Sequence, residues 1–248
     1  MPRTVRKRSK TGVYHVIIRG IDKQCIFHDD EDRNIFLDRL KRYKHECSFE
    51  IYAYCLMSNH VHLLIKEHEE SVSLVMKKIS ISYVYWYNKK YDRTGYLFQG
   101  RFISEPVEND SYLLTAARYI HQNPVKVGLT MQDWTSYSGY LKRNEIVDSE
   151  IILGIFGQNE RKALENFIHF MNEQNLSQCL DSDENEKFTD KNAEIIIKEL
   201  GSVTSCRDLR KLKREERDGI LRKLKNEGLA VRQISRITGI HRKSIISA

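Results

Sequence analysis

The chain has 248 residues, of which 40% are hydrophobic and 30% are charged, and its formal net charge is +7. This length predicts one or two domains with a buried core, which excludes a disordered tail and a small disulfide-stapled scaffold. The mean hydropathy is −0.55, and no uncharged apolar run reaches the length of about 18 residues that a membrane span needs. No apolar stretch follows the basic first ten residues, so we also expect no secretory signal.

Five cysteines are present, and none of them forms a CxxC pair. An odd number of cysteines without the CxxC spacing favours free thiols in a reducing cytosol over a disulfide framework or a cysteine-zinc site.

The charge is unevenly distributed along the chain. Residues 1–143 carry 23 Lys+Arg against 16 Asp+Glu (+7), residues 144–200 carry 5 against 13 (−8), and residues 201–248 carry 13 against 5 (+8). Clustered cations bind phosphate backbones by releasing counterions, so two basic blocks favour two nucleic-acid contacts, and solvated helix faces are the alternative. We expect a first domain over 1–143, an acidic helical connector over 144–200 and a basic helical module over 201–248.

Strand and helix patterns alternate in the first domain. Residues rich in β-branched and aromatic types predict strands over 13–19, 48–56, 60–66 and 101–107. Apolar residues three and four apart predict helices over 29–45, 71–91 and 110–123, with Asp29 or Asp30 capping the first and Asp110 or Ser111 the last. The order predicts an α+β class: a ferredoxin-like antiparallel sheet with helices packed on one face. In strand 48–56, alternation places Ile51, Ala53 and Cys55 on one face.

Beyond Trp134 the strand signals fade. Helical patterns over 159–174, 189–200, 205–225 and 229–248 predict an all-α C-terminal module.

Two histidines one residue apart are the sharpest local feature. Because side chains alternate along a strand, His60 and His62 point to one face while Val61 points to the other. Two neutral imidazoles so placed can chelate one divalent ion, although an HxH pattern alone is more often a pair of hydrogen-bonding histidines. Tyr119 and Asn123 stand four residues apart on one face of the predicted helix 110–123, with His121 pointing elsewhere. A core-edge tyrosine and an Asn-Pro turn are the ordinary interpretations of these two.

Together the motifs YCLMSNHVHLLI, GYLFQGRF and RYIHQNPVKVGL resemble the HUH single-tyrosine transposases, and most of all their REP-associated tyrosine transposase branch. The resemblance covers about residues 10–140. It implies an HUH nuclease core with a Mg²⁺ or Mn²⁺ site made by His60, His62 and Asn123, and with Tyr119 as the nucleophile. The third ligand is the weakest assignment, because asparagine offers one neutral oxygen on a short arm.

The implied chemistry suits these residue types. A divalent ion held by neutral ligands keeps its charge to offset the charge that develops on a phosphate. A tyrosine nucleophile forms a phosphotyrosyl bond that conserves the energy of the broken phosphodiester, so the strand can be rejoined. With an ordinary pKa of about 10, the phenol needs help from the metal or from a cation such as Arg118 or Lys126. Arg118 lies on a neighbouring face of the predicted helix.

Basic and aromatic residues suggest the surfaces that bind DNA. The residues expected to contact phosphates are Arg3, Arg6, Lys7, Arg8 and Lys10 in a flexible N-terminal arm, and Arg101 in the GRF motif. A solubilising tail is the alternative for the arm. Among the aromatic residues of 83–91, Tyr85 and Tyr87 are the best candidates for stacking on unpaired bases.

The stretch VRQISRITGIHRKSIIS fits a helix-turn-helix, with Gly239 at the turn and Ile234 and Ile245 in the core. Arg242, Lys243 and Ser244 then open the recognition helix and face the groove of duplex DNA. An ordinary helical hairpin is the alternative.

The sequence thus favours a metal-dependent single-stranded DNA transesterase of bacterial type, cytoplasmic and on the nucleoid when bound to DNA. The resemblance implies cleavage near a DNA hairpin. A DNA-binding regulator without cleavage, and a relaxase or replication-initiator nicking enzyme, are the rivals. The expected partners are single-stranded or hairpin DNA and, for the C-terminal module, duplex DNA; a monomer and a homodimer both stay open.

Overall fold

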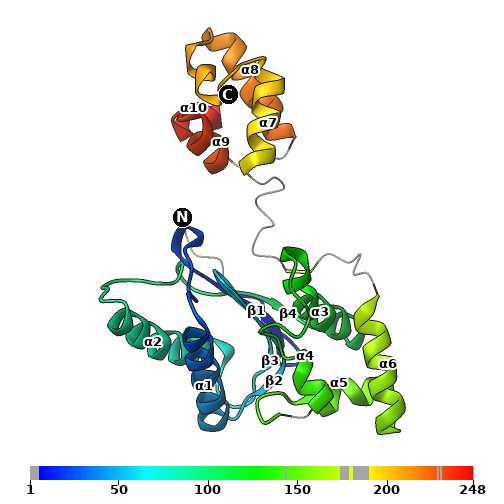
Figure 1. Cartoon of the computed structure of the whole chain (residues 1–248). Coiled ribbons are helices and arrows are strands. Elements are labelled where there is room, and N and C mark those ends of the chain that lie inside the picture. Colours follow the sequence, from blue (N-terminus) through cyan, green and yellow to red (C-terminus); the bar gives the residue numbers. More distant parts are fainter. Residues whose placement is uncertain are drawn as a thin grey trace. The chain divides into compact units, whose positions relative to one another are not determined.

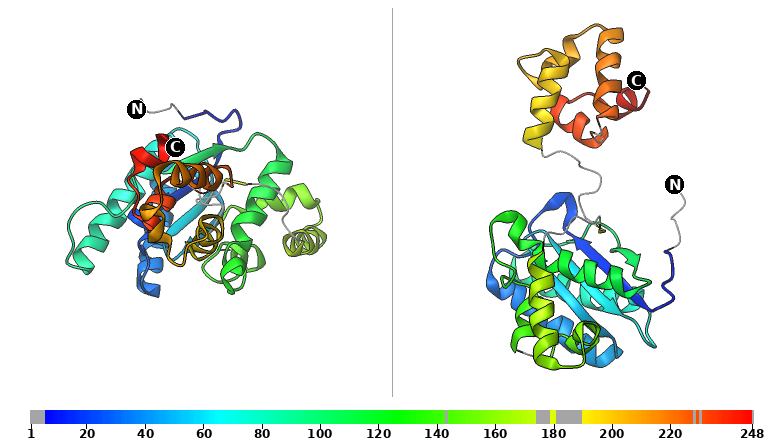
Figure 2. Two further views of the ribbon diagram at one scale, coloured as in Figure 1. Left: turned by 90° about the horizontal axis from the view of Figure 1, so that it is seen from above. Right: turned by 90° about the vertical axis from the view of Figure 1, so that its right-hand side faces the viewer.

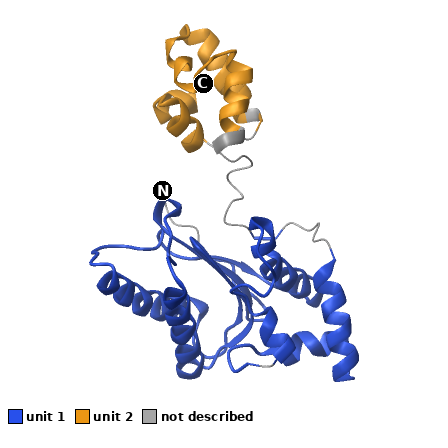
Figure 3. Ribbon diagram, viewed as in Figure 1, with its two compact units in different colours: residues 1–180 blue, residues 181–248 orange. Residues whose placement is uncertain are grey.

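The computed structural model describes residues 6–142, 144–173, 179–180, 190–227, 229 and 231–247. The chain divides into two compact units, residues 1–180 and residues 181–248 (Figure 3), and each has its own hydrophobic core. The division differs from the three regions expected from charge. Ile152 and Phe167 of the expected connector lie in the first core, whereas Ile197 lies in the second. Apolar packing, rather than the sign of the charge, therefore sets the boundary.

Unit 1 is built on a four-stranded antiparallel sheet (Figure 1). Its strands are β1 (Val13–Arg19), β2 (Glu50–Met57), β3 (His60–Lys66) and β4 (Ile103–Pro106), in the order β2-β3-β1-β4. The strands β2 and β3 form a hairpin, since they are consecutive and pair antiparallel. The strands β3 and β1 are central, and their side chains are buried along nearly their whole length.

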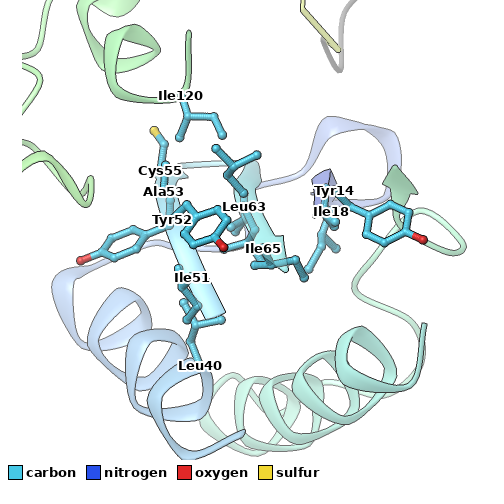
Figure 4. Close-up of a cluster of buried hydrophobic side chains, with 14 of the residues drawn as sticks. Tyr14, Ile18, Leu40, Ile51, Tyr52, Ala53, Cys55, Leu63, Ile65 and Ile120 are labelled. Atoms are coloured by element: carbon cyan, nitrogen blue, oxygen red, sulfur yellow. The ribbon is translucent and has the colours of Figure 1, made fainter. Parts of the chain in front are cut away.

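Helices cover both faces of this sheet. The helices α1 (Asp30–Cys47) and α2 (Val72–Lys90) lie on one face, and α3 (Asp110–Gln122) lies on the other (Figure 1). Figure 4 shows Leu40 of α1 and Ile120 of α3 on opposite sides of the strands. The expected α+β sheet is confirmed, but its helices are not confined to one face, because the strands are apolar on both sides.

Two local details differ from the expectation. The cap of α3 is Asn109, whose side chain accepts a hydrogen bond from the backbone of Tyr112 at 2.8 Å, rather than Asp110 or Ser111. In β2 the register shifts between Ile51 and Ala53, so a β-bulge breaks the alternation that would have placed both on one face. Asp29 caps α1 as expected and forms a capping box with Asp32.

Three further helices complete unit 1: α4 (Tyr137–Lys142), α5 (Ser149–Phe156) and α6 (Glu160–Asn172). The helix α6 lies beside α3 (Figures 1 and 2). Phe167 stacks on Tyr140 with ring centroids 4.4 Å apart, and Arg118 of α3 pairs with Glu173 at 2.9 Å. The first contact joins α6 to α4, and the second joins α3 to the end of α6.

The described part of unit 2 contains helices and no strand: α7 (Asp190–Gly201), η3 (Cys206–Lys211), α8 (Arg214–Asn226), α9 (Val231–Thr238) and α10 (Arg242–Ser247). The predicted helix over 229–248 is thus two short helices separated by Gly239, whose φ is +68°. No helix in the described ranges is both long and apolar enough to cross a membrane.

Candidate active site

The central strand β3 carries both predicted histidines on the face covered by α3. The ring centroids of His60 and His62 lie 4.9 Å apart. His62 is fully buried and His60 is half-buried at the start of the strand. Asn59 Oδ1 lies 2.6 Å from His60 Nδ1, and because an amide oxygen can only accept, Nδ1 donates. Nε2 is then the His60 atom that could bind a metal in the neutral ring.

A third histidine, which the sequence did not single out, belongs to the same cluster. His15 of β1 is fully buried, and its Nε2 lies 3.0 Å from His62 Nδ1. The signal that could have revealed His15 is its polarity, because every other residue of β1 up to Ile18 is apolar or aromatic. A polar side chain in the middle of a buried strand needs a hydrogen-bonding partner.

Tyr119 reaches these histidines from α3. Its ring centroid lies 5.7 Å from that of His62 and 6.0 Å from that of His15. Ala116 and Ala117, both fully buried, are the small residues with which this part of α3 packs. The Tyr119 side chain is only 7% exposed. The phenol therefore lies at the histidines but beneath the protein surface.

The turn after α3 brings a cation to the same point. Lys126 lies in η2 (Pro124–Val127), and its Nζ is 4.0 Å from the centre of the Tyr119 ring. Arg118, although adjacent to Tyr119 in sequence, pairs with Glu173 and covers the Phe170 ring on the other side of α3.

Asn123 ends α3 beside Tyr119, and His121 indeed points elsewhere, towards Ser136. The Asn123 side-chain amide donates to the Tyr119 carbonyl at 2.9 Å, and the residue is 5% exposed. Its Nδ2 is therefore used to close the helix, which leaves Oδ1 as the atom that could serve as a metal ligand.

The electrostatics of the cluster suit metal binding. Burial, together with the charges of His60, His15 and Lys126, holds the pKa of His62 well below its ordinary value, so this ring is neutral. His62 Nε2 is buried and has no hydrogen-bond partner in the described part of the chain. A buried lone pair of this kind is what a divalent ion requires of imidazole. The same ranges contain no group of three or more His, Cys, Asp or Glu that could hold a metal, so a third protein ligand would have to be of another type, such as Asn123.

The predicted arm is partly fixed to unit 1. Arg6 donates to the Phe102 carbonyl at 2.8 Å and to Ser73 at 3.1 Å, and its guanidinium lies 3.7 Å from the Phe102 ring centre. The expectation of a flexible arm is therefore wrong for Arg6, because cation–π and hydrogen-bond contacts hold it. Lys7, Arg8, Lys10 and Arg101 are exposed, and Arg3 lies outside the described residues.

The C-terminal motif lies in the turn between α9 and α10 and in the helices beside it. Ile234 and Ile245 are fully buried, and Ser235 Oγ donates to the Ile240 carbonyl at 2.7 Å across the turn. Arg242 and Lys243 begin α10 with exposed side chains, and Ser244 is half-buried.

A family model matches part of the chain. Residues 9–123 match the family model described as "Transposase IS200 like", a range that includes His60, His62, Tyr119 and Asn123. The match covers less than half of the chain, so it is a similarity of this segment to that family. No curated protein matches the chain.

Two solved structures are similar to part of the chain. One is the REP-associated tyrosine transposase bound to a REP hairpin, at 18% identity and a TM-score of 0.49, over 58% of this chain and 87% of that chain. The other is a crystal structure assigned to a transposase of Deinococcus radiodurans R1, at 15% identity and a TM-score of 0.35, over 52% of this chain and 99% of that chain.

Proposed function

We propose that the protein is a metal-dependent DNA transesterase that cuts single-stranded DNA near a hairpin and rejoins it. The observation that carries the proposal is the meeting of Tyr119 with His62, at 5.7 Å between ring centroids, although 57 residues separate them in the chain. A regulator that only binds DNA needs no phenol at a buried pair of imidazoles. The GYLFQGRF and RYIHQNPVKVGL motifs favour a hairpin of the REP type over a plasmid nicking site.

The reaction begins with attack by Tyr119 Oη on the phosphorus of a phosphodiester. The bond from phosphorus to the 3′-oxygen breaks, the 3′-oxygen takes up a proton and leaves as a 3′-hydroxyl, and the phenol loses its proton. The product is a 5′-phosphotyrosine. A 3′-hydroxyl of an acceptor strand then attacks the same phosphorus, which rejoins the DNA and restores the phenol.

His60 and His62, with Asn123 as the third candidate, would hold Mg²⁺ or Mn²⁺. When bound, the ion supplies positive charge that polarises the phosphate and offsets the charge that develops on its oxygens. The chain itself supplies the position of Tyr119, the exclusion of water by the surrounding core, and the Lys126 ammonium beside the ring. Because Tyr119 is 7% exposed, its ring has to turn towards the surface when the DNA strand enters.

Unit 2 would add a second contact, to duplex DNA, through α10. The Gly239 turn directs Arg242 and Lys243 outwards from the core that Ile245 anchors. Two exposed cations at the start of a short helix suit phosphate and major-groove contacts.

The decisive experiment is incubation of the full chain with labelled hairpin DNA bearing single-stranded flanks, with Mg²⁺ or Mn²⁺, followed by denaturing electrophoresis. We expect a covalent adduct that EDTA prevents and that Tyr119→Phe abolishes. Tyr54→Phe, which removes another buried phenol oxygen of the same core, is the control and should keep the adduct. Binding without an adduct on every hairpin tested would favour the regulator instead.

A further inference from the structure

A hydrogen bond between two buried imidazoles lies behind the candidate metal ligand. His15 Nε2 and His62 Nδ1 are 3.0 Å apart, and both side chains are 0% exposed. Between two neutral rings one nitrogen must donate and the other must accept, so this contact couples the positions of the two ring protons. His62 Nε2 has no hydrogen-bond partner among the described residues.

The choice of proton position decides whether His62 can bind a cation. If Nδ1 of His62 donates to His15, the lone pair of His62 lies on Nε2, where no protein atom uses it. If Nδ1 accepts instead, Nε2 carries a proton and cannot bind a metal. Metal-binding histidines in proteins usually donate their other N–H to a fixed acceptor, which orients the ring and sets the tautomer.

The fold keeps His15 in this place. His15 lies on β1, the central strand that pairs with β3 on one side and β4 on the other. Its backbone pairs with that of Leu64 on β3 and with that of Glu105 on β4. The Glu105 carboxylate accepts a short hydrogen bond from the Tyr112 hydroxyl of α3. A buried ring on a strand that is paired on both sides loses little freedom when it accepts a hydrogen bond.

We propose that His15 is a positioning residue that accepts the Nδ1 proton of His62 and so keeps His62 Nε2 available to a divalent cation. The inference rests on the proposed function, because it assigns a support to the proposed metal site. It predicts that His15 itself touches neither the metal nor DNA.

Binding of Mn²⁺ alone to the full chain, followed by the electron paramagnetic resonance of free Mn²⁺, tests the proposal without DNA or activity. We expect His15→Leu, which keeps bulk but accepts no hydrogen bond, to weaken Mn²⁺ binding about 10- to 100-fold. His15→Gln, whose side-chain oxygen can accept at a similar reach, should restore most of the affinity. Circular dichroism and the melting temperature establish that each variant is folded.

A second readout separates positioning from mere packing. In metal-free protein, ¹⁵N chemical shifts of the histidine rings should report the Nδ1–H form of His62, and this form should be lost in His15→Leu and kept in His15→Gln. Equal Mn²⁺ affinity and an unchanged tautomer in folded His15→Leu would refute the role of His15 alone. No Mn²⁺ binding by the unsubstituted protein would refute the metal site itself, and with it this inference.

A separate observation concerns an apolar groove of about 500 Å³ between α2 and the loop 95–100, called here the α2 groove. Its lining is mostly apolar and includes Ile81, Tyr85, Tyr96 and Phe98. Ile81, Tyr85 and Tyr96 are 59%, 75% and 86% exposed. Large apolar side chains gathered at one place on a surface mark an interaction site.

The charge beside the α2 groove indicates what it binds. Residues 71–101 contain six basic residues and one acidic residue. Two of the lysines are paired with carboxylates, Lys78 with Glu70 and Lys90 with Asp29. Arg101, next to the groove residue Gly100, is exposed and makes no hydrogen bond or ion pair with any described residue, so its charge is available to an anion.

Backbone hydrogen bonds connect this loop with the start of β3. Gln99 N donates to the Arg19 carbonyl at 2.8 Å, and Gly20 N donates to the Asn59 carbonyl at 2.9 Å. The α2 groove is on the α2 side of the sheet, whereas His60 and His62 are on the α3 side. A DNA strand that contacts both therefore has to pass around the edge of the sheet.

We infer that the α2 groove takes unpaired bases of a single-stranded flank of the substrate, stacked on Tyr85 and Tyr96, with Arg101 at the phosphates. Aromatic faces beside cations are the usual means of holding single strands without reading their sequence. The inference rests on the proposed single-stranded substrate.

Fluorescence anisotropy with labelled oligothymidylate measures this contact directly. We expect Tyr85→Ala and Tyr96→Ala each to weaken binding about 5- to 150-fold, which corresponds to about 1–3 kcal/mol per stacked base. Tyr96→Phe should bind like the unsubstituted chain, because stacking needs the ring and not the hydroxyl. Ile151→Ala, an exposed apolar residue of α5 that does not line the groove, is the control and should have no effect.

The adduct assay distinguishes a failure of the groove proposal from a failure of the proposed transesterase function. An unsubstituted protein that forms the hairpin adduct, with oligothymidylate affinity unchanged in both alanine variants, would refute the groove and leave the transesterase intact. A loss of self-association in Tyr96→Ala by sedimentation, again without change in affinity, would show that a second copy of the chain covers the groove and would refute nucleotide binding there.

Discussion

Lys126 and Arg118 are the two cations nearest to Tyr119 in the sequence of α3 and η2, and their surroundings assign them different tasks. Lys126 Nζ is 4.0 Å from the Tyr119 ring centre, and a positive charge beside a phenol favours its ionised form. We therefore expect Lys126→Met to slow adduct formation at least about tenfold, because the developing phenolate loses its neighbouring cation. Arg118→Met is the matched control: it breaks the contact with Glu173, so it should lower the melting temperature and leave the rate of the folded protein unchanged. Equal rates for both variants would remove Lys126 from the chemistry.

Single residues also mark how far the sequence could predict the site. His60 and His62 were predictable because strand alternation fixes their common face, and Tyr119 with Asn123 because helical spacing does the same. His15 was not, because its partner His62 lies 47 residues away and only the strand register brings the two together. The role of the Asn123 side chain was ambiguous in the sequence, because asparagine suits both the end of a helix and an oxygen ligand for a metal.

Gly239 is the residue on which the α9–α10 element depends. Its φ of +68° is unfavourable for any side chain, and an added Cβ would lie 2.1 Å from Arg210 Nη2, whose guanidinium Nε donates to the Thr238 carbonyl. We expect Gly239→Ala to destabilise unit 2 by at least about 1–2 kcal/mol. Gly219→Ala, inside α8 with open space around it, should stabilise the same unit by about 0.5–1 kcal/mol. Amide hydrogen exchange of peptides from α8 to α10 measures the stability of unit 2 in both variants. A stability change of the same sign in the two variants would contradict this account.

At the level of elements, long periodic segments were predictable and short or irregular ones were not. The ranges of β1, β3, α1, α2 and α6 agree with their patterns within about two residues. The helices α4 and α5 were missed because six and eight residues give too few apolar repeats. The bulge in β2 was missed because Ile51, Tyr52 and Ala53 are all buried, so hydrophobicity alone could not reveal which of them leaves the alternation.

Each unit has its own core, so we expect each unit to unfold without the other. Leu221 is fully buried in the core of unit 2, and Leu221→Asp would place a carboxylate there at a cost of several kcal/mol. We expect this variant to lose binding to duplex DNA while it still forms the adduct with hairpin DNA. Ile195→Asp adds the same charge at an exposed site of α7 and should bind duplex DNA nearly as well as the unsubstituted chain. Loss of adduct formation in Leu221→Asp alone would show that unit 2 is needed for the chemistry.

The extent of the units was the least predictable feature. Charge changes sign near residues 143 and 200, but the division lies at 180 because α5 and α6 present apolar faces to unit 1 and α7 presents one to the second core. A charge pattern describes the surface, and a boundary is decided by which apolar faces meet.

Mass spectrometry of the covalent adduct, after nuclease and trypsin digestion, tests most directly the assignment of the nucleophile. Cleavage after Arg118 and Lys126 releases residues 119–126, in which Tyr119 is the only tyrosine. We expect the nucleotide remnant on that peptide, attached to the phenol oxygen. A remnant on any other peptide, such as the one that contains Tyr96, would place the chemistry away from the histidines and contradict the account.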